Sequence, residues 1–422
     1  MSVFNLLLDP IPLPRMVKAE QKYPRPILIN PVEEFKTSLN NSGLLSRVSV
    51  GMSIAITVGS RGVSNQPQLV RALVTELKKV GAEPFIIPAM GSHGGATAEG
   101  QIAILQGMDV TEETIGAPIR ATMETVILGE AAPGLPVQID KYAHEADGII
   151  IINRIKPHVA FRGPYESGLA KMIAIGLGKQ RGAEVCHRMG FGKMAEHIPT
   201  IAKKVIAESN ILFAIGTIEN AYHETARIEV IPIEDLLELE PALQEESKGL
   251  CAKLFTDRLD VLILDEIGKD ITGTGFDTNV VGRYHTPFIS GGPEITRIAV
   301  LNITDRSKGN GNGLGIVDFT TKRAFDKFKF EMSYPNALTS TVPVSVKIPM
   351  VLENDRQAIQ AAVKTSNIAN QEDVRLIRIK NTNEMDILEI SESLLVEAEN
   401  SSTLKILSDP YELKFDANGN LF

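Results

Sequence analysis

The chain has 422 residues, of which 43% are hydrophobic and 23% are charged, and its formal net charge is −9. This length is two to three times that of a typical domain, so two domains are expected. The acidic balance argues against a nucleic-acid-binding protein, which would carry a basic face. The two cysteines, Cys186 and Cys251, cannot form a disulfide framework or a CxxC pair, and they fit a reducing cytoplasm.

Targeting and membrane signals are not found in the sequence. The N-terminus has no basic region ahead of its short apolar run, so a signal peptide is not expected. No apolar stretch reaches the ~20 residues that a membrane span needs. We therefore predict a cytoplasmic protein that binds neither nucleic acid nor membranes.

Strand and helix patterns alternate through residues 46–250, after an arm (residues 1–45) that we expect to pack over the first domain. Apolar, β-branched runs predict strands at 50–58, 83–90, 124–128, 148–153 and 211–215. Amphipathic spacing predicts helices at about 65–80, from about 97, and around 169–178 and 195–208. Strand–helix alternation with short turns is typical of a mainly parallel, doubly wound, Rossmann-like sheet.

A second α/β domain is predicted after an acid-rich helical connector at 234–246. We place the boundary near residue 250, which gives an N-terminal domain at 1–250 and a C-terminal domain at 251–422. The tail, 413–422, could pack back on the first domain. The elements predicted for the second domain are strands near 259–265, 297–303, 344–348, 374–379 and 386–390, and helices at 320–328 and 355–365.

Three unusual polar residues follow predicted strands of the first domain. Arg61, His93 and His158 each come a few residues after the end of a strand. In a parallel sheet, ligands bind in the crevice beyond the carboxyl ends of the strands. The sequence therefore predicts that these side chains converge at one edge of the sheet.

The residue types at this edge suit acid–base chemistry. His93 has glycines on both sides, which leaves its ring uncovered by neighbouring side chains. Two histidines from separate strand ends can act as proton acceptor and donor, because an unperturbed imidazole titrates near pH ~6.5.

Two lysine positions leave alternatives open. Lys171 opens an otherwise apolar helix, so it is either a desolvated nucleophile or cofactor tether, or an ordinary solvated lysine. Lys179 and Arg181 could hold a phosphate with backbone N–H groups, or they could be solvated loop cations. The surrounding residues do not satisfy the P-loop pattern.

Other catalytic motifs are absent from the sequence. The glycine-rich segment 309–315 does not satisfy G-x-G-x-x-G, so it does not support a nicotinamide site. No G-x-S-x-G elbow stands at a strand–helix turn, and no H-E-x-x-H motif marks a hydrolytic metal site.

Five short stretches, taken in order, resemble the nickel-dependent lactate racemase family. They are Gly-Ser-Arg61, Gly-Ser-His93, Lys-Pro-His158, Ser-Gly-Leu-Ala-Lys171 and His187. The resemblance covers most of the first domain and, more loosely, the plan of two α/β domains. It implies an active site in the cleft between them.

The resemblance also implies a cofactor, the nickel-pincer nucleotide (nickel held by a pyridinium-3,5-bisthiocarboxylic acid mononucleotide). Lys171 stands where the family forms a thioamide link to this nucleotide, and His187 stands where a histidine ligates the nickel. Arg61, with Ser60 beside it, matches the arginine that serves the anionic groups of the site. One imidazole on a soft nickel centre is chemically sensible.

The reaction that the resemblance implies is racemisation or epimerisation of a 2-hydroxy acid. The family transfers hydride to the pincer ring, which gives a transient 2-keto acid that can be reduced again from either face. The cofactor carries the hydride chemistry, and the protein supplies orientation and proton transfer. His93 and His158 take the places of the proton acceptor and donor. From the second domain, Asn279 and Arg283 lie roughly where the family draws substrate contacts.

The sequence differs from the family pattern around the substrate and the nucleotide. The family's first-strand motif has an acid where Val58 stands, and Leu169 replaces a glycine of the lysine motif. These differences leave room for a substrate larger than lactate, such as a sugar acid or a hydroxy diacid. Expected partners are this small molecule and the enzymes that make the cofactor, and a homo-oligomer is compatible with the sequence.

Two other functions stay open from the sequence. One is a non-catalytic ligand-binding or sensing homologue that keeps the fold without the lysine tether. The other is a different lyase or oxidoreductase that uses Lys171 with another cofactor on the same scaffold.

Overall fold

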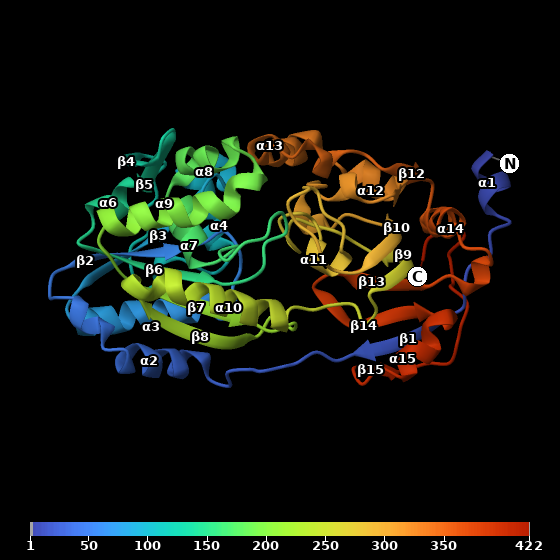
Figure 1. Cartoon of the computed structure of the whole chain (residues 1–422), viewed down its shortest axis with the longest axis horizontal. Helices are drawn as coiled ribbons and strands as arrows, with labels where there is room; N and C mark the ends of the chain where they lie inside the picture. The colour runs from blue at the N-terminus through green and yellow to red at the C-terminus, as the bar shows by residue number, and fades with distance from the viewer. Residues whose placement is uncertain (1–2, 422) are drawn as a thin grey trace. The chain divides into compact units, whose positions relative to one another are not determined.

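A computed structural model describes residues 3–421 of the chain. The chain divides into two compact units, each with its own α/β architecture. One unit is the continuous segment Arg25–Cys251, and the other combines Met1–Pro24 with Ala252–Phe422. The predicted fold class, two α/β domains, is confirmed (Figure 1).

The unit Arg25–Cys251 is built on a five-stranded sheet with the order β3-β2-β6-β7-β8. The first four strands are parallel neighbours, and β8 pairs antiparallel with β7. The strands are β2 (Ser53–Val58), β3 (Glu83–Pro88), β6 (Gly148–Arg154), β7 (Ile211–Glu219) and β8 (Thr225–Pro232). Their buried, β-branched runs explain the strands, since a parallel strand covered on both faces is apolar along its whole length.

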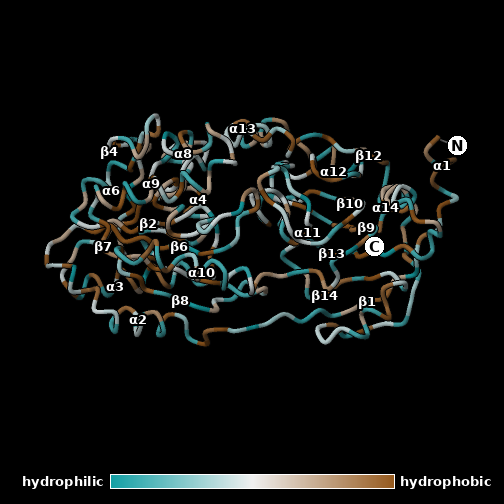
Figure 2. Tube along the Cα trace, in the orientation of Figure 1, coloured by the Kyte–Doolittle hydropathy of each residue, from teal (hydrophilic) through white to brown (hydrophobic). Residues whose placement is uncertain are grey.

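Helices cover both faces of this sheet (Figure 1). The helix pair α2 and α3 packs on one face, and α7, α9 and α10 lie over the other. Hydrophobic stretches run along β2, β6 and β7 between them (Figure 2). The longer helices are α2 (Pro31–Asn41), α3 (Gln66–Lys79), α4 (Ala98–Gln106), α8 (Lys179–Arg188), α9 (Met194–Glu208) and α10 (Leu236–Leu250), and the short ones are α5 (Glu112–Ile115), α6 (Lys141–Glu145) and α7 (Leu169–Lys171).

One predicted strand of this unit does not join the parallel sheet. Residues 125–132 form β4 (Thr125–Ala132), which pairs antiparallel with β5 (Leu135–Asp140) in a separate two-stranded sheet. The turn at Gly134, with φ +74°, lets the chain fold back on itself at once. The strand β4 therefore pairs with β5, the next strand along the chain, and not with a strand of the parallel sheet.

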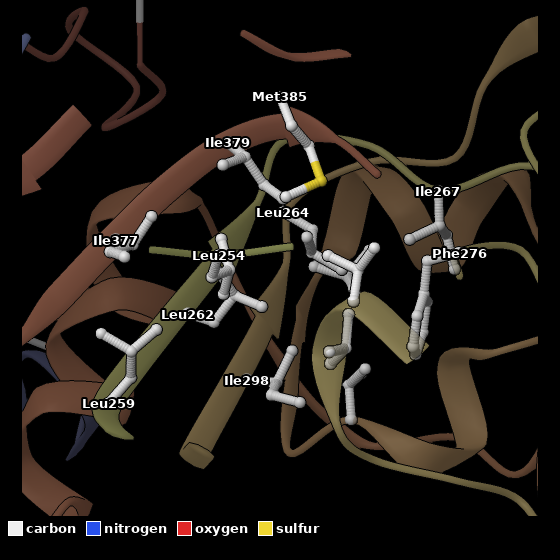
Figure 3. Close-up of a cluster of buried hydrophobic side chains, with 14 of the residues drawn as sticks. Leu254, Leu259, Leu262, Leu264, Ile267, Phe276, Ile298, Ile377, Ile379 and Met385 are labelled. Atoms are coloured by element: carbon white, nitrogen blue, oxygen red, sulfur yellow. The ribbon is translucent and has the colours of Figure 1, made fainter. Parts of the chain in front are cut away.

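The other unit contains an eight-stranded sheet with the order β12-β11-β10-β9-β13-β14-β1-β15. Its core places leucines and isoleucines of β9, β10 and β13 against Phe276 and Met385 (Figure 3). Its strands are β1 (Met16–Gln21), β9 (Arg258–Leu264), β10 (Glu294–Val300), β11 (Phe319–Thr321), β12 (Met350–Leu352), β13 (Leu376–Asn381), β14 (Glu384–Ser391) and β15 (Leu404–Ile406). Its helices are α1 (Val3–Leu8), α11 (Thr278–Val281), α12 (Lys322–Lys327), α13 (Phe330–Ser340), α14 (Asp355–Thr365) and α15 (Leu395–Glu399).

The structure corrects the expected ends of the domains. Residues 1–24 do not belong to the first domain, because β1 pairs antiparallel with β14 and β15 near the other end of the chain. The tail makes its described contacts in this same unit: the Leu421 N–H donates to Asp355, and Phe415 packs on its core. The prediction of 1–250 and 251–422 is therefore wrong for the N-terminal segment, although the chain does leave the first unit at Cys251.

A second correction concerns residues 344–348, which were predicted as a strand. They lie mostly in a short 3-10 helix at Pro343–Val346, and the strand β12 follows it. Pro343 cannot donate to a sheet ladder, and it fits the first turn of a helix. No helix among residues 3–421 is long and apolar enough to cross a membrane.

Candidate functional site

The predicted site residues of the first unit follow the carboxyl ends of adjacent parallel strands. Ser60 and Arg61 come after β2, His93 after β3 and His158 after β6, in a sheet where β3, β2 and β6 are neighbours. The chain runs from β2 outward to β3 on one side, and from β6 outward to β7 on the other. The point where the winding reverses is therefore the gap between β2 and β6, which is where ligands bind in such sheets.

A buried carboxylate holds the loop that carries Arg61. Glu219, at the end of β7, accepts from the Ser64 N–H at 2.7 Å and forms an ion pair with Arg154 at the end of β6. Burial raises the pKa of Glu219, but its bonds to His223 and Ser64 and the charge of Arg154 lower that pKa to about 2. The carboxylate is thus ionised and ties three strand ends together.

The turn that carries His93 packs directly on the segment that carries Lys171. Gln101 on α4 donates from Nε2 to the carbonyl oxygens of Gly91 and His93, at 2.9 and 3.3 Å. The Gly91 N–H donates to the Gly176 carbonyl at 3.2 Å. His93 Nδ1 lies 2.8 Å from the Met90 carbonyl oxygen, which can only accept, so Nδ1 carries the proton and Nε2 has the lone pair in the neutral ring.

The loop that carries His158 is closed by backbone bridges and a buried glutamate. The Lys156 N–H donates to the Ser167 carbonyl at 2.7 Å, which closes the loop at its base. Glu166 is fully buried; it accepts from the His158 N–H at 2.8 Å and pairs with Lys248 of α10 at 2.8 Å. His158 Nδ1 accepts from the Ala160 N–H at 3.1 Å, so its neutral ring carries the proton on Nε2. The rings of His93 and His158 are therefore held in opposite tautomers.

Lys171 ends the single turn α7 and is followed by a π-helical turn, Met172–Gly176. Such turns in a helix frequently lie at functional sites. Burial lowers the pKa of the Lys171 amine to about 8, and the positive charges of Lys156 and Arg61 contribute to this lowering, against a small opposing effect of Cys186. Lys171 is half-buried, and its pKa is lowered in the direction that a nucleophile or cofactor tether requires.

His187 is linked to His158 through one aromatic ring. It lies on α8, and its ring centroid is 5.7 Å from that of Phe191, which is 6.0 Å from the ring of His158. His187 Nδ1 lies 2.7 Å from the Ala183 carbonyl oxygen, so Nδ1 carries the proton and Nε2 has the lone pair. Burial lowers the pKa of His187, and the charge of Lys171 lowers it as well.

Lys179 is neither a phosphate-binding residue nor a solvated loop cation, so both predictions for it are wrong. Its side chain is fully buried, forms an ion pair with Asp140 at 2.9 Å, and donates to the Pro88 carbonyl at 2.6 Å and to Gln101 at 3.0 Å. All three contacts are inside the fold, so Lys179 stabilises it. Arg181, which shared those predictions, is exposed.

The two residues predicted from the second domain lie in the unit that contains α11. The Arg283 guanidinium pairs with Asp318 at 2.5 Å and donates to the carbonyl oxygens of Ile295 and Thr296. The side-chain amide of Asn279 donates to Asp277 at 2.9 Å. The contacts of Arg283 are those of a residue that fastens strand ends, and a substrate role for either residue stays a prediction.

Several residues that build the site were not found from the sequence. Lys156 and Phe191 contribute charge and ring contacts, and Glu166, Glu219 and Glu240 contribute buried carboxylates. Only Glu219 follows an apolar run of the sequence, whereas Glu166 lies in a polar loop sequence and Glu240 in the acid-rich segment, where nothing marks it as buried. Among residues 3–421, no group of three or more His, Cys, Asp or Glu side chains could hold a metal ion.

Comparison with known proteins gives a family match and matches among solved structures. Residues 25–199 match the family model described as the lactate racemase N-terminal domain. The lactate racemase apoprotein from Thermoanaerobacterium thermosaccharolyticum has a similar fold, with a TM-score of 0.51, over 85% of this chain and 93% of that one, at 14% sequence identity. No curated protein matches the chain by sequence.

The fold and the matched domain define a two-unit α/β protein whose first unit has a doubly wound sheet, with the candidate polar residues after its strand ends. Residues 25–199 are similar in sequence to the lactate racemase N-terminal domain. This match suggests racemase activity.

Proposed function

We propose that the protein is a racemase or epimerase of a 2-hydroxy acid that uses a nickel-pincer nucleotide linked to Lys171. The observation that carries the proposal is the convergence, in one unit, of a desolvated lysine, an imidazole with its lone pair on Nε2, and two further histidines in opposite tautomers. These groups match the tether, the metal ligand and the proton-transfer pair that such an enzyme needs.

Lys171 fits the tether. A lysine must lose its proton before its nitrogen can form a thioamide, and burial near the cations of Lys156 and Arg61 lowers its pKa to about 8. A sizeable fraction of the amine is therefore neutral near physiological pH. The same two cations suit the phosphate of a mononucleotide or the carboxylate of a substrate.

His187 fits the metal ligand. A histidine that ligates a metal usually donates its other ring N–H to a carbonyl or carboxylate, which fixes its tautomer and direction. The bond from Nδ1 to the Ala183 carbonyl does this and directs the lone pair to Nε2. Burial also keeps the ring neutral, as a ligand must be.

When bound, the cofactor would supply a hydride acceptor for the substrate carbon. The chain supplies the proton chemistry. His93 can accept the hydroxyl proton of the substrate at Nε2, and His158 can donate a hydrogen bond from Nε2 to a substrate oxygen. Gln101 and Glu166 hold the backbones of these two residues, so both rings are positioned before the substrate arrives.

Mass spectrometry of the Lys171 peptide tests the proposal most directly. The protein is produced together with the enzymes that make the cofactor, and we expect the cofactor mass on Lys171. Lys179 is the matched control, because it is also a buried lysine but is paired with Asp140 and should remain unmodified. An unmodified Lys171 in such a preparation contradicts the proposal.

Turnover is then measured with both enantiomers of lactate, a hydroxy diacid and a sugar acid. We expect His93→Ala and His158→Ala to retain nickel but to abolish racemisation, and His187→Ala to lose nickel while Lys171 stays modified. Ligand binding without modification would indicate a binding or sensing protein. Turnover without nickel would indicate another lyase or oxidoreductase.

A further inference from the structure

The turn that carries Lys171 is clamped by a glutamate from a helix 70 residues further along the chain. Glu240 lies on α10, and its two carboxylate oxygens accept from the N–H groups of Leu169 and Ala170, at 2.7 and 2.8 Å. The carboxylate is fully buried, and so are both donors. These two N–H groups belong to the first turn of α7, where a helix has no backbone acceptor of its own.

Gly168 makes this arrangement possible. It stands at the N-cap position of α7, where it has no side chain to cap the helix. A Cβ atom at Gly168 would lie 2.0 Å from Oε1 of Glu240, so any other residue would displace the carboxylate. Asn153 of β6 donates to the Gly168 carbonyl at 2.9 Å. The start of α7 is therefore held from the sheet on one side and from α10 on the other.

Fold stability does not account for a carboxylate at this place. Among the described residues Glu240 forms no ion pair, and its hydrogen bonds are the two to backbone N–H groups. Burial raises its pKa to about 7, although both N–H groups lower it. Tyr165, whose pKa is raised by burial and by the charge of Glu240, brings no positive charge. An ionised carboxylate in such a site makes the folded state less stable as the pH rises from 4.5 to about 7.

We propose that Glu240 is a positioning residue that fixes Lys171 in the site by clamping the two preceding amides. With the amides of Leu169 and Ala170 fixed, the direction of the next side chain is fixed as well, because a helical side chain follows its backbone. The clamp keeps the Lys171 amine in its buried, cation-rich surroundings. The purpose given to Lys171 rests on the proposed function, but the clamp itself does not.

The test follows the Lys171 amine in the full chain without any cofactor. Trace acetylation with acetic anhydride, read by mass spectrometry from pH 6 to 11, gives the pH midpoint of each lysine. We expect a midpoint near 8 in the unaltered protein. In Glu240→Gln the amide group turns a donor toward one of the two N–H groups, the turn loosens, and water reaches the amine. The midpoint should rise by about one pH unit or more, which lowers the reactive fraction at pH 8 about fivefold.

Glu238→Gln is the matched control, since Glu238 is an exposed glutamate on the same helix. In this variant the pH midpoint of Lys171 acetylation should stay unchanged. Gly168→Ala should shift the midpoint as Glu240→Gln does, although it leaves the carboxylate in the chain. A folded Glu240→Gln protein with an unchanged midpoint overturns the proposal.

If neither variant folds, amide hydrogen exchange in the unaltered protein decides. Slow exchange at both Leu169 and Ala170, comparable with the interior of β6, supports the clamp, and fast exchange at either overturns it. None of these measurements depends on nickel or turnover. A failure of the proposed function would therefore leave their outcome unchanged.

Discussion

Removal of the buried cation Lys179 tests whether the contacts between β3, α4, β5 and α8 stabilise the first unit. Lys179→Met keeps the length of the side chain but leaves Asp140, which is fully buried, with a hydrogen bond from the Ala143 N–H and no cation. Breaking a buried pair by removing one partner costs about 3–5 kcal/mol, because the other charge stays buried and uncompensated. For a unit of this size that corresponds to a fall in Tm of roughly 10 °C.

Thermal unfolding of the unaltered protein and the variant, followed by circular dichroism, measures this change. The double variant Lys179→Met/Asp140→Asn should recover at least half of the loss, because the asparagine amide oxygen can still accept from the Ala143 N–H without carrying a charge. A single variant that loses less than about 1 kcal/mol would falsify the reasoning, since a surface pair costs no more than that. Recovery in the double variant is the signature of a buried charge and not of lost packing.

Three further outcomes are expected. Glu219→Gln should lower the free energy of unfolding by about 3 kcal/mol at pH 7, because the pKa of Glu219 is lowered from 4.5 to about 2 in the folded state. That stabilisation is present above pH 4.5 and is lost between pH 4.5 and 2, so the variant should lose less stability than the unaltered protein over this range. An equal loss in both proteins, measured by urea titration, contradicts this. Cys186, whose pKa burial raises to about 12, should resist iodoacetamide at pH 8 while the partly exposed Cys251 reacts, and equal labelling by peptide mass would refute the reasoning. Glu166→Gln should lower turnover at least tenfold through the His158 loop while bound nickel is retained, and full activity would show that the loop is held by its backbone alone.

The places of three candidate residues after strand ends could be predicted from local sequence. Arg61, His93 and His158 each follow a strand that is recognisable by its apolar run, and adjacent parallel strands must end at the same edge. The lowered pKa of Lys171 was also foreseeable from its apolar neighbours. Their proposed roles in catalysis came from the resemblance and still await the experiments above.

The supporting residues could not be predicted, because each acts far from its place in the sequence. Glu240 caps a helix 71 residues earlier, and Glu219 fastens the loop of Ser64, 155 residues earlier. Local propensity gives no information about such pairs. The prediction for Lys179 was wrong for a related reason. Glycines around a lysine suit a phosphate loop, but the partner of Lys179 is Asp140, and only the packing of the hairpin β4–β5 against α8 brings the two together.

The pairing of β1 determines the order in which the two units of this protein can fold. Met16 lies opposite Ser391, so the first strand has no partner until nearly the whole chain has left the ribosome. At about 5–20 residues per second, that wait is roughly 20–75 s. The segment Arg25–Cys251 is continuous and is synthesised in the meantime, so it can fold first. An unpaired strand exposed for so long is a site for wrong association, and shortening the wait or shielding residues 16–21 should raise the yield of correctly folded protein.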